Sequence, residues 1–314
     1  MIRFFDNYME NFLNGNTSLH NNDKSGMSLS LKVAKLFLII GFLSSISACS
    51  SIISSATSKM ANNLSSTILN SSDTQTVADG APAYLLLVSS FLKDGADNEG
   101  LLRSAAGLHS AYAGVFVKDK SRAAAMSSQA LDYALQAVCV SNADFCELRK
   151  TPFVDFGLSL KKLTKKDVAT WYVLGTTWAG WIQANSKDWN AVAELARVKA
   201  VFKRLLELEP TYKEGGVHLY MAVLSSLLPP ALGGKPEIGK MHFEKAIELS
   251  KNKNLMAKVL YAEKYAKLLF KKQLHDNLLN EVLKADPIAK DLTLMNTLAQ
   301  QKAKTLLAAS DDYF

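Results

Sequence analysis

Apolar residues recur at helical spacing along most of the chain after residue 49, and few segments alternate with the period of two that strands require. Proline and glycine are few, and they are grouped at the breaks between these amphipathic segments. The pattern predicts helices at about 52–69, 99–116 and 121–139, and a turn at Asp79-Gly80 followed by a helix that begins at Pro82. The chain is therefore predicted to be all-α, with helices packed on helices.

A repeat motif appears after residue 167. Trp171, Leu174, Gly175 and Trp178 match the W-x2-L-G-x2-Y signature of the first helix of a tetratricopeptide repeat, with Trp178 in place of Tyr. The large residues of this motif fill the groove between paired helices, and its glycine lets the second helix come close. Second-helix endings recur about 41 and 36 residues apart, near the roughly 34 of such a repeat, at 204–210, 245–250 and 280–287. Residues 79–314 are predicted to form an α-α superhelix of degenerate tetratricopeptide-like helix-turn-helix repeats.

The segment 228–237 lengthens the turn inside one repeat. Pro229 and Pro230 end the helix before it, and the glycines that follow permit left-handed backbone. Pro236 with Glu237 is expected to begin the next helix. The Gly-Gly-Lys sequence in this segment lacks the spacing and the preceding strand of a phosphate-binding loop.

The N-terminal part carries the marks of a secretory signal. Two lysines, Lys32 and Lys35, precede an apolar run at 36–43, and small residues lead to Cys49. A membrane-spanning helix needs roughly 20 apolar residues, and serines cut this run short. We expect residues 1–48 to be an N-terminal extension and lipoprotein signal peptide, with Met27 as an alternative start. Residues 49–78 are then the tether, lipidated at Cys49, and the first helix.

The charge of the chain bears on its partners, and its cysteine content bears on a possible disulfide. The net charge is +7, spread along the chain, with the densest cluster at Lys161–Lys166 expected to be a solvated linker. Nucleic acid is not an expected partner in an extracytoplasmic compartment. Two cysteines, Cys139 and Cys146, remain beside Cys49. They either form a disulfide across a helix end or stay as two buried thiols, and both alternatives are open.

The residues that carry catalytic or metal chemistry show no matching spacing. The five histidines have no ligand pattern, and His242 with Glu244 lacks the second histidine of a helical zinc site. His275 and Asp276 are neighbours in sequence and are expected to point to different helix faces. We predict no enzyme activity, no metal and no cofactor.

Several long blocks resemble one known family, the TRAP-transporter-associated tetratricopeptide lipoproteins called TatT. The likeness runs from about Lys32 to Phe314, and its blocks are Asp79–Leu87, His218–Tyr220, Pro229–Glu237, His242-Phe243, Leu274-His275-Asp276, Asn296–Gln300 and Asp311–Phe314. The resemblance implies a periplasm-facing lipoprotein of four repeats that forms a homotrimer. It also implies docking of a periplasmic solute-binding protein that carries small, often carboxylate-bearing ligands to a secondary transporter.

A ligand or partner site is expected on the concave surface that first helices form in such arrays. Aromatic side chains can line a groove there, and a cation beside them attracts a carboxylate. The candidates are His218, Tyr220, Lys235, Trp181, His109, Tyr112 and Arg103. The predicted function is a non-enzymatic outer-membrane lipoprotein that docks the solute-binding protein and helps transfer small organic-acid or hydrophobic ligands. The alternative is a tetratricopeptide scaffold lipoprotein for outer-membrane or cell-wall assembly.

Overall fold

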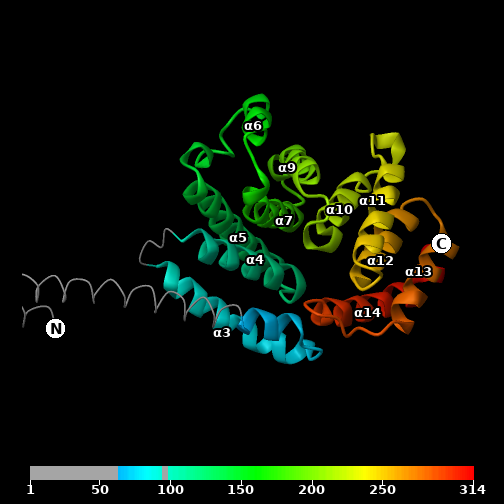
Figure 1. Cartoon of the computed structure of the whole chain (residues 1–314). Coiled ribbons are helices and arrows are strands. Elements are labelled where there is room, and N and C mark those ends of the chain that lie inside the picture. The colour runs from blue at the N-terminus through cyan, green and yellow to red at the C-terminus, as the bar shows by residue number, and fades with distance from the viewer. Residues whose placement is uncertain (1–62, 94–97) are drawn as a thin grey trace, which may run out of the picture. The chain divides into compact units, whose positions relative to one another are not determined.

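The computed structural model describes residues 63–93 and 98–314. Every element within these ranges is a helix, which confirms the predicted all-α superhelix. Residues Leu64–Phe314 form one compact unit (Figure 1). The predicted signal peptide, the lipidation of Cys49 and the first part of the predicted tether lie outside the described residues. Among the described helices, we find none with the length and apolar character needed to cross a membrane.

Helix α3 (Thr74–Leu92) begins earlier than the sequence pattern suggests. The side chain of Asp73 accepts hydrogen bonds from two backbone N–H groups of the first turn and so caps the helix. Pro82 lies inside this helix, so the predicted turn before it and the predicted start at Pro82 are wrong. Because proline has no N–H, the carbonyl of Ala78 loses its helical donor. The Tyr112 hydroxyl donates to that carbonyl instead, at 3.3 Å.

Helices α4 (Glu99–Val115) and α5 (Lys120–Ser141) pack against each other close to their predicted bounds. Asn98 and Asp119 cap their N-termini through side-chain oxygens. Ala106 of α4 is fully buried in this contact region, and small side chains of this kind let two helices approach closely.

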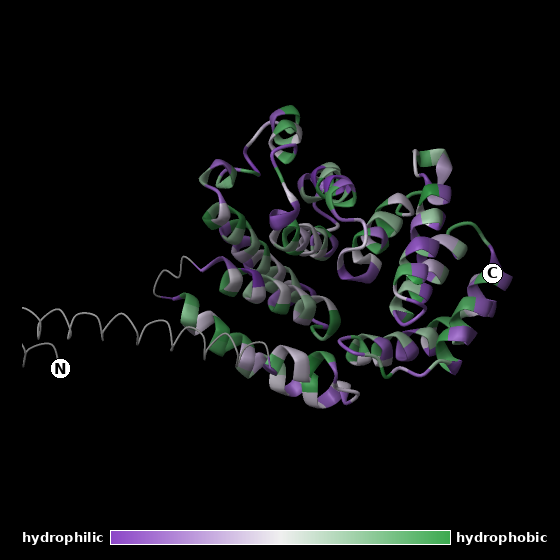
Figure 2. Ribbon diagram, in the orientation of Figure 1, coloured by the Kyte–Doolittle hydropathy of each residue, from purple (hydrophilic) through white to green (hydrophobic). Residues whose placement is uncertain are grey.

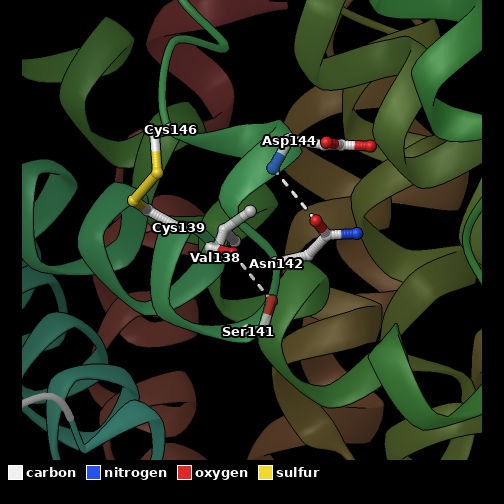
Figure 3. Close-up of a disulfide and its surroundings, with 6 residues drawn as sticks. All are labelled: Val138, Cys139, Ser141, Asn142, Asp144 and Cys146. Carbon is white, nitrogen blue, oxygen red and sulfur yellow. Dashed lines mark hydrogen bonds between the residues drawn. A yellow bond between two sulfur atoms is a disulfide. The ribbon is translucent and has the colours of Figure 1, made fainter.

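A disulfide joins Cys139, near the end of α5, to Cys146 (Figure 3). Their Cα atoms lie 4.3 Å apart, so of the two alternatives for these cysteines the structure has the pair. The closed loop contains the short helix η1 (Ala143–Phe145). Phe145 of this loop is buried and turns the edge of its ring to Trp171, with centroids 5.1 Å apart. The disulfide thus holds a loop that closes one end of the core.

The tetratricopeptide motif lies in α7 (Val168–Ala184), which packs on α9 (Leu195–Leu208). Its four residues are all buried, as the motif predicts. A Cβ atom at Gly175 would lie 2.9 Å from the ring of Phe202, so only glycine allows this approach of the two helices. Shorter helices flank the pair: α6 (Phe153–Leu160), η2 (Lys165–Asp167) and α8 (Trp189–Ala193).

The predicted insertion separates α10 (Tyr212–Ser225) from α11 (Pro236–Leu249). It contains the short helix η3 (Pro230–Leu232) and Gly233, whose φ of 81° is left-handed. Pro236 occupies the first position of α11, as predicted.

The C-terminal part consists of short and medium-length helices that pack on one another: α12 (Leu255–Tyr261), η4 (Ala262–Ala266), α13 (Lys272–Lys284), α14 (Thr293–Ala308) and α15 (Ser310–Tyr313). In Figure 2 apolar and polar residues share each helix of the unit, as expected for helices with one buried stripe. One apolar core joins helices from α4 to α10, and a second joins helices from α10 to α14.

The end of the array returns to its beginning. Asn70, just before α3, accepts a hydrogen bond from the backbone of Asp291 at 2.8 Å and donates to the side chain of the same residue at 3.1 Å. Gln301 of α14 donates to Thr74 at 3.3 Å. Figure 1 shows one end of α14 next to the start of α3. The helices of this unit therefore form a closed arc.

Candidate functional site

Four aromatic rings from α7, α9 and α10 meet around Tyr172. The ring of Tyr172 makes T-shaped contacts with Tyr212 at 5.2 Å, Tyr220 at 6.0 Å and Phe202 at 6.1 Å, measured between ring centroids. Phe202 and Tyr220 are stacked at 4.8 Å. These are favourable arrangements for aromatic pairs. We refer to Tyr172, Tyr212 and Tyr220 as the first tyrosine cluster.

The hydroxyl groups of the first tyrosine cluster have no hydrogen bond within the described part of the protein, and none is sealed from solvent. Burial raises the pKa of Tyr220 to about 12. Burial also raises the pKa of Tyr172 well above its usual value, and the charges of Tyr220 and Tyr212 add to this effect. The hydroxyls are therefore protonated at neutral pH. They are hydrogen-bond donors that are surrounded by protein and still reached by solvent.

Arg103 of α4 lies beside this cluster. Its guanidinium donates to the hydroxyl of Thr170 at 3.2 Å and lies 3.7 Å from a carboxylate oxygen of Glu99, which also accepts a hydrogen bond from Thr170. Burial raises the pKa of Tyr212, the charge of Arg103 lowers it in part, and Glu209 raises it further. The charge of Arg103 thus acts on Tyr212, one of the three phenol groups.

An unusual backbone turn brings Tyr212 to Tyr172. Lys213, Glu214 and Gly215 all have left-handed φ values, of 51°, 51° and 91°. A left-handed conformation costs about 1–2 kcal/mol at each non-glycine residue. At Gly216 a Cβ atom would lie 2.7 Å from the hydroxyl oxygen of Tyr172. Strained backbone persists only where the surrounding structure holds it in place. Such residues often cluster at functional sites.

Two histidines from different helices meet next to this region. The Nδ1 atoms of His218, on α10, and His242, on α11, lie 2.8 Å apart. Desolvation lowers the pKa of His218 to about 4, with further lowering from the charge of His242, and burial lowers the pKa of His242. Both rings are neutral at pH 7, so the Nδ1–H of one ring donates a hydrogen bond to the Nδ1 of the other. The sequence did not indicate this pair because the residues stand 24 positions apart on separate helices.

His109 and Tyr112 are buried in the packing of α4 and do not belong to the first tyrosine cluster. A ring nitrogen of His109 lies 2.9 Å from the carbonyl of Ala105, and its ring packs against Tyr133 at 5.4 Å. Tyr112 satisfies the carbonyl that Pro82 leaves free in α3. Of the predicted site residues, these two hold helices together.

Trp181 and Lys235 lie at two other places. The indole N–H of Trp181 donates to Ser128 at 3.1 Å, and the guanidinium of Arg149 lies 4.5 Å from the centroid of its ring. Lys235 is exposed at the start of α11. The structure therefore brings together Arg103 and Tyr220 of the predicted set and adds Tyr172 and Tyr212 to them. His218 lies next to this cluster, and the other four predicted residues lie elsewhere.

His275 and Asp276 contact each other, so the expectation that these neighbours point apart is wrong. His275 Nδ1 lies 2.8 Å from a carboxylate oxygen of Asp276, which also accepts from Ser310 at 2.6 Å, and Lys272 lies 3.1 Å from the other oxygen. Burial raises the pKa of Asp276, but these three partners outweigh it and lower the value to about 2. Ser310 donates to the aspartate and not to the histidine, so this cluster ties α15 to α13 and is not a nucleophilic relay.

Within the described residues, no group of three or more His, Cys, Asp or Glu side chains is placed to hold a metal ion. The polar residues that sequence reasoning missed at the tyrosine site are Tyr212, Thr170 and Glu99. The sequence did contain a sign of Tyr212: the pair Gly215-Gly216 shortly after it indicates unusual backbone or a close approach of another group.

A comparison with protein families gives one match. The family model TAtT, described as TRAP transporter T-component, matches residues 70–314. The matched range covers nearly all of the described residues and more than half of the chain. None of the curated proteins matches the sequence.

Proposed function

The chain belongs to the TRAP transporter T-component family, and on that premise we propose that it docks a periplasmic solute-binding protein and helps transfer small organic-acid or hydrophobic ligands. Family membership by itself gives the chain a role associated with a TRAP transporter. The observation that carries the proposal is the extent of the match, which runs from just before α3 to the last residue. The proposed role belongs to the whole helical array, and it is non-enzymatic.

The proposed place of action is the periplasmic side of the outer membrane. The disulfide between Cys139 and Cys146 supports this, because disulfides persist in oxidising compartments. In this proposal Cys49 carries the lipid anchor, and the array assembles as a homotrimer. Intact mass of the protein purified from membranes tests the anchor, since acylation adds mass to the N-terminal peptide.

The proposed contact surface for the solute-binding protein lies at the segment between α10 and α11. This segment and the first turns of α11 expose apolar side chains, with Leu232 67% and Met241 56% exposed, on either side of the exposed Lys235 in sequence. The other exposed apolar residues there are Leu227, Leu228 and Ile238. Gathered apolar exposure of this kind is typical of interaction surfaces. Lys235 adds a positive charge that would favour an acidic rim on the partner.

A photo-crosslinking amino acid at Leu232 in the full chain, in its native cells, tests this role. We expect mass spectrometry to recover a solute-binding protein from this position. The same amino acid at Lys199, exposed on α9, serves as the matched control and should recover much less of it. Recovery of outer-membrane assembly or cell-wall proteins from Leu232, without any solute-binding protein, would overturn the proposal and favour the scaffold alternative.

A further inference from the structure

Two groups of tyrosines in this array differ in the partners of their hydroxyls: the residues of the first are partly exposed, and those of the second are buried. We refer to Tyr261 and Tyr265, on α12 and η4, as the second tyrosine cluster. Tyr261 donates to Glu244 at 3.2 Å, and Tyr265 donates to Glu237 at 2.8 Å and accepts from Lys271 at 2.6 Å. The hydroxyls of the first tyrosine cluster have no such partners in the described part of the chain. The first cluster thus offers three phenol donors that protein surrounds, that have no acceptor inside the described protein and that solvent reaches, so a molecule entering from solvent can accept their hydrogen bonds.

The charges around the first tyrosine cluster define which ligand fits. Arg103 supplies one positive charge, and its ion pair with Glu99, at 3.7 Å and partly exposed, is loose. Phenol O–H groups and a guanidinium are all donors, so they suit a group that only accepts hydrogen bonds. An ionised carboxylate is such a group, and a guanidinium binds it with charge-assisted hydrogen bonds.

We propose that the hydroxyls of Tyr172, Tyr212 and Tyr220, together with the guanidinium of Arg103, bind the carboxylate of a small ligand. This inference rests on the proposed function, because it names the site and the chemical class for the ligand transfer assumed there. The rings of these tyrosines and of Phe202 provide an apolar wall for the rest of the ligand. The left-handed turn at 213–215 is the backbone feature that sets Tyr212 in place for this task.

A monovalent carboxylate fits better than a phosphate or an alcohol. A phosphate dianion would bring two negative charges to a region where one arginine already faces Glu99 and where Glu209 acts on Tyr212. A neutral alcohol would use the phenol donors but would gain nothing from Arg103. The site therefore discriminates by charge as well as by hydrogen bonding.

Calorimetric titration of the full protein with benzoate tests the site, because benzoate carries one carboxylate on an apolar ring. We expect saturable binding at millimolar concentration, with benzamide and inorganic phosphate binding much more weakly. Arg103→Gln and Tyr172→Phe should each weaken benzoate binding about tenfold, the size expected for loss of one charge-assisted hydrogen bond. Tyr265→Phe, in the second tyrosine cluster, is the matched control and should bind benzoate like the parent protein.

Fluorine NMR of protein labelled with 3-fluorotyrosine locates the binding. Benzoate should shift the signals that disappear in the phenylalanine variants of Tyr172, Tyr212 and Tyr220, and leave those of Tyr261 and Tyr265 in place. Absence of saturable binding, equal binding by benzamide, or unchanged affinity in Arg103→Gln would each overturn the inference. Thermal melting confirms that each variant is folded.

The two proposals fail in different ways. The crosslinking experiment at Leu232 needs no ligand, so recovery of a solute-binding protein together with a negative benzoate titration would remove this site and leave the docking role intact. Saturable benzoate binding with no crosslinked solute-binding protein would support the carboxylate site and remove the docking role.

Discussion

The first and second tyrosine clusters have similar aromatic packing, but they differ in burial and in the partners of their hydroxyls: the second cluster is buried and the first is partly exposed. Each packs on a fully buried phenylalanine: Phe202 stacks on Tyr220 at 4.8 Å, and Phe243 stacks on Tyr261 at 5.2 Å. In the second cluster, helix α11 supplies Glu237 and Glu244 as acceptors. In the first cluster no helix supplies an acceptor to the hydroxyls within the described residues.

This difference teaches that aromatic packing and hydroxyl chemistry are separate properties of a tyrosine cluster. Packing stabilises both clusters. A carboxylate at hydrogen-bond distance makes the second cluster self-contained, because each hydroxyl has its partner inside the protein. The hydroxyls of the first cluster have no acceptor within the described protein and are open to solvent, and the proposed carboxylate ligand would accept from them.

The largest effect is expected from removal of the two phenylalanine rings. Phe202→Ala and Phe243→Ala should each lower the free energy of unfolding by about 3–5 kcal/mol, because both leave a cavity in a packed core. Urea denaturation followed by circular dichroism measures this loss. Benzoate binding should be lost only in Phe202→Ala, measured under conditions where both variants are folded. Equal loss of binding in Phe243→Ala would erase the distinction between the clusters.

A smaller effect is expected from Gly216→Ala. The new Cβ would lie 2.7 Å from the hydroxyl oxygen of Tyr172 and 3.1 Å from the side chain of Lys213, so the cluster must shift. We expect a loss of about 1–3 kcal/mol in unfolding free energy, as in overpacked cores. Combining the change with Tyr172→Phe removes the closest atom and should restore part of the loss. A strictly additive double variant would show that the tyrosine hydroxyl does not point at Gly216.

The hydroxyls themselves are expected to give the next effect. Tyr265→Phe should lower the unfolding free energy by about 1–2 kcal/mol, since it removes the atom that bridges Glu237 and Lys271. Tyr172→Phe should change it by less than about 0.5 kcal/mol, because no internal hydrogen bond is lost. Chemical denaturation at neutral pH compares the two variants directly. If Tyr172→Phe proves as costly as Tyr265→Phe, the first cluster has an internal partner and is not a ligand site.

The smallest effect is expected from the pair His218–His242, which joins α10, part of the first cluster, to α11, which supplies the acceptors of the second cluster. Their pKa values are lowered in the folded protein, that of His218 to about 4 from 6.5. The unfolded chain therefore binds more protons between these values, so stability is fully present above about pH 6.5 and is lost as the pH falls toward 4. Partial exposure of His218 reduces the size of this loss.

Denaturant midpoints at pH 7 and pH 5 measure this dependence. The parent protein should lose more stability between the two values than His218→Gln, in which one titrating ring is gone. Lys245 and Glu248 act on His218 as well, and they remain in the variant. An identical loss in both proteins would place the pH dependence elsewhere.

Much of the fold could be predicted from local sequence. Periodicity indicated α4 and α5 nearly to the residue, and the motif at 171–178 indicated a tightly packed helix pair in which Gly175 contacts Phe202. The start of α3 was misjudged, because Pro82 is a typical first residue of a helix. The hydrogen bond that Pro82 removes from α3 is offset by the cap at Asp73 and by the Tyr112 hydroxyl. Tyr112 lies on another helix, so the local sequence around Pro82 gives no sign of it.

The candidate site could be predicted only in part. Arg103 and Tyr220 were predicted because they are a basic and an aromatic residue on helices expected to line the concave surface. The same reasoning selected His109 and Tyr112, which are buried in the helix packing. Residue type and helix position do not tell whether a side chain finds a partner across the helix interface. That depends on contacts between residues tens of positions apart.

The sequence by itself determined the all-α repeat architecture, the bounds of helices such as α4 and α5, and the family, because these depend on spacing along the chain and on motifs within one segment. The tertiary structure decided which tyrosine hydroxyls have acceptors, which histidines meet, and whether Cys139 reaches Cys146. The physical reason is one of range. Helix formation is set by neighbours within one or two turns, whereas a hydrogen bond requires two atoms within about 3 Å, and only the packing of helices brings them there.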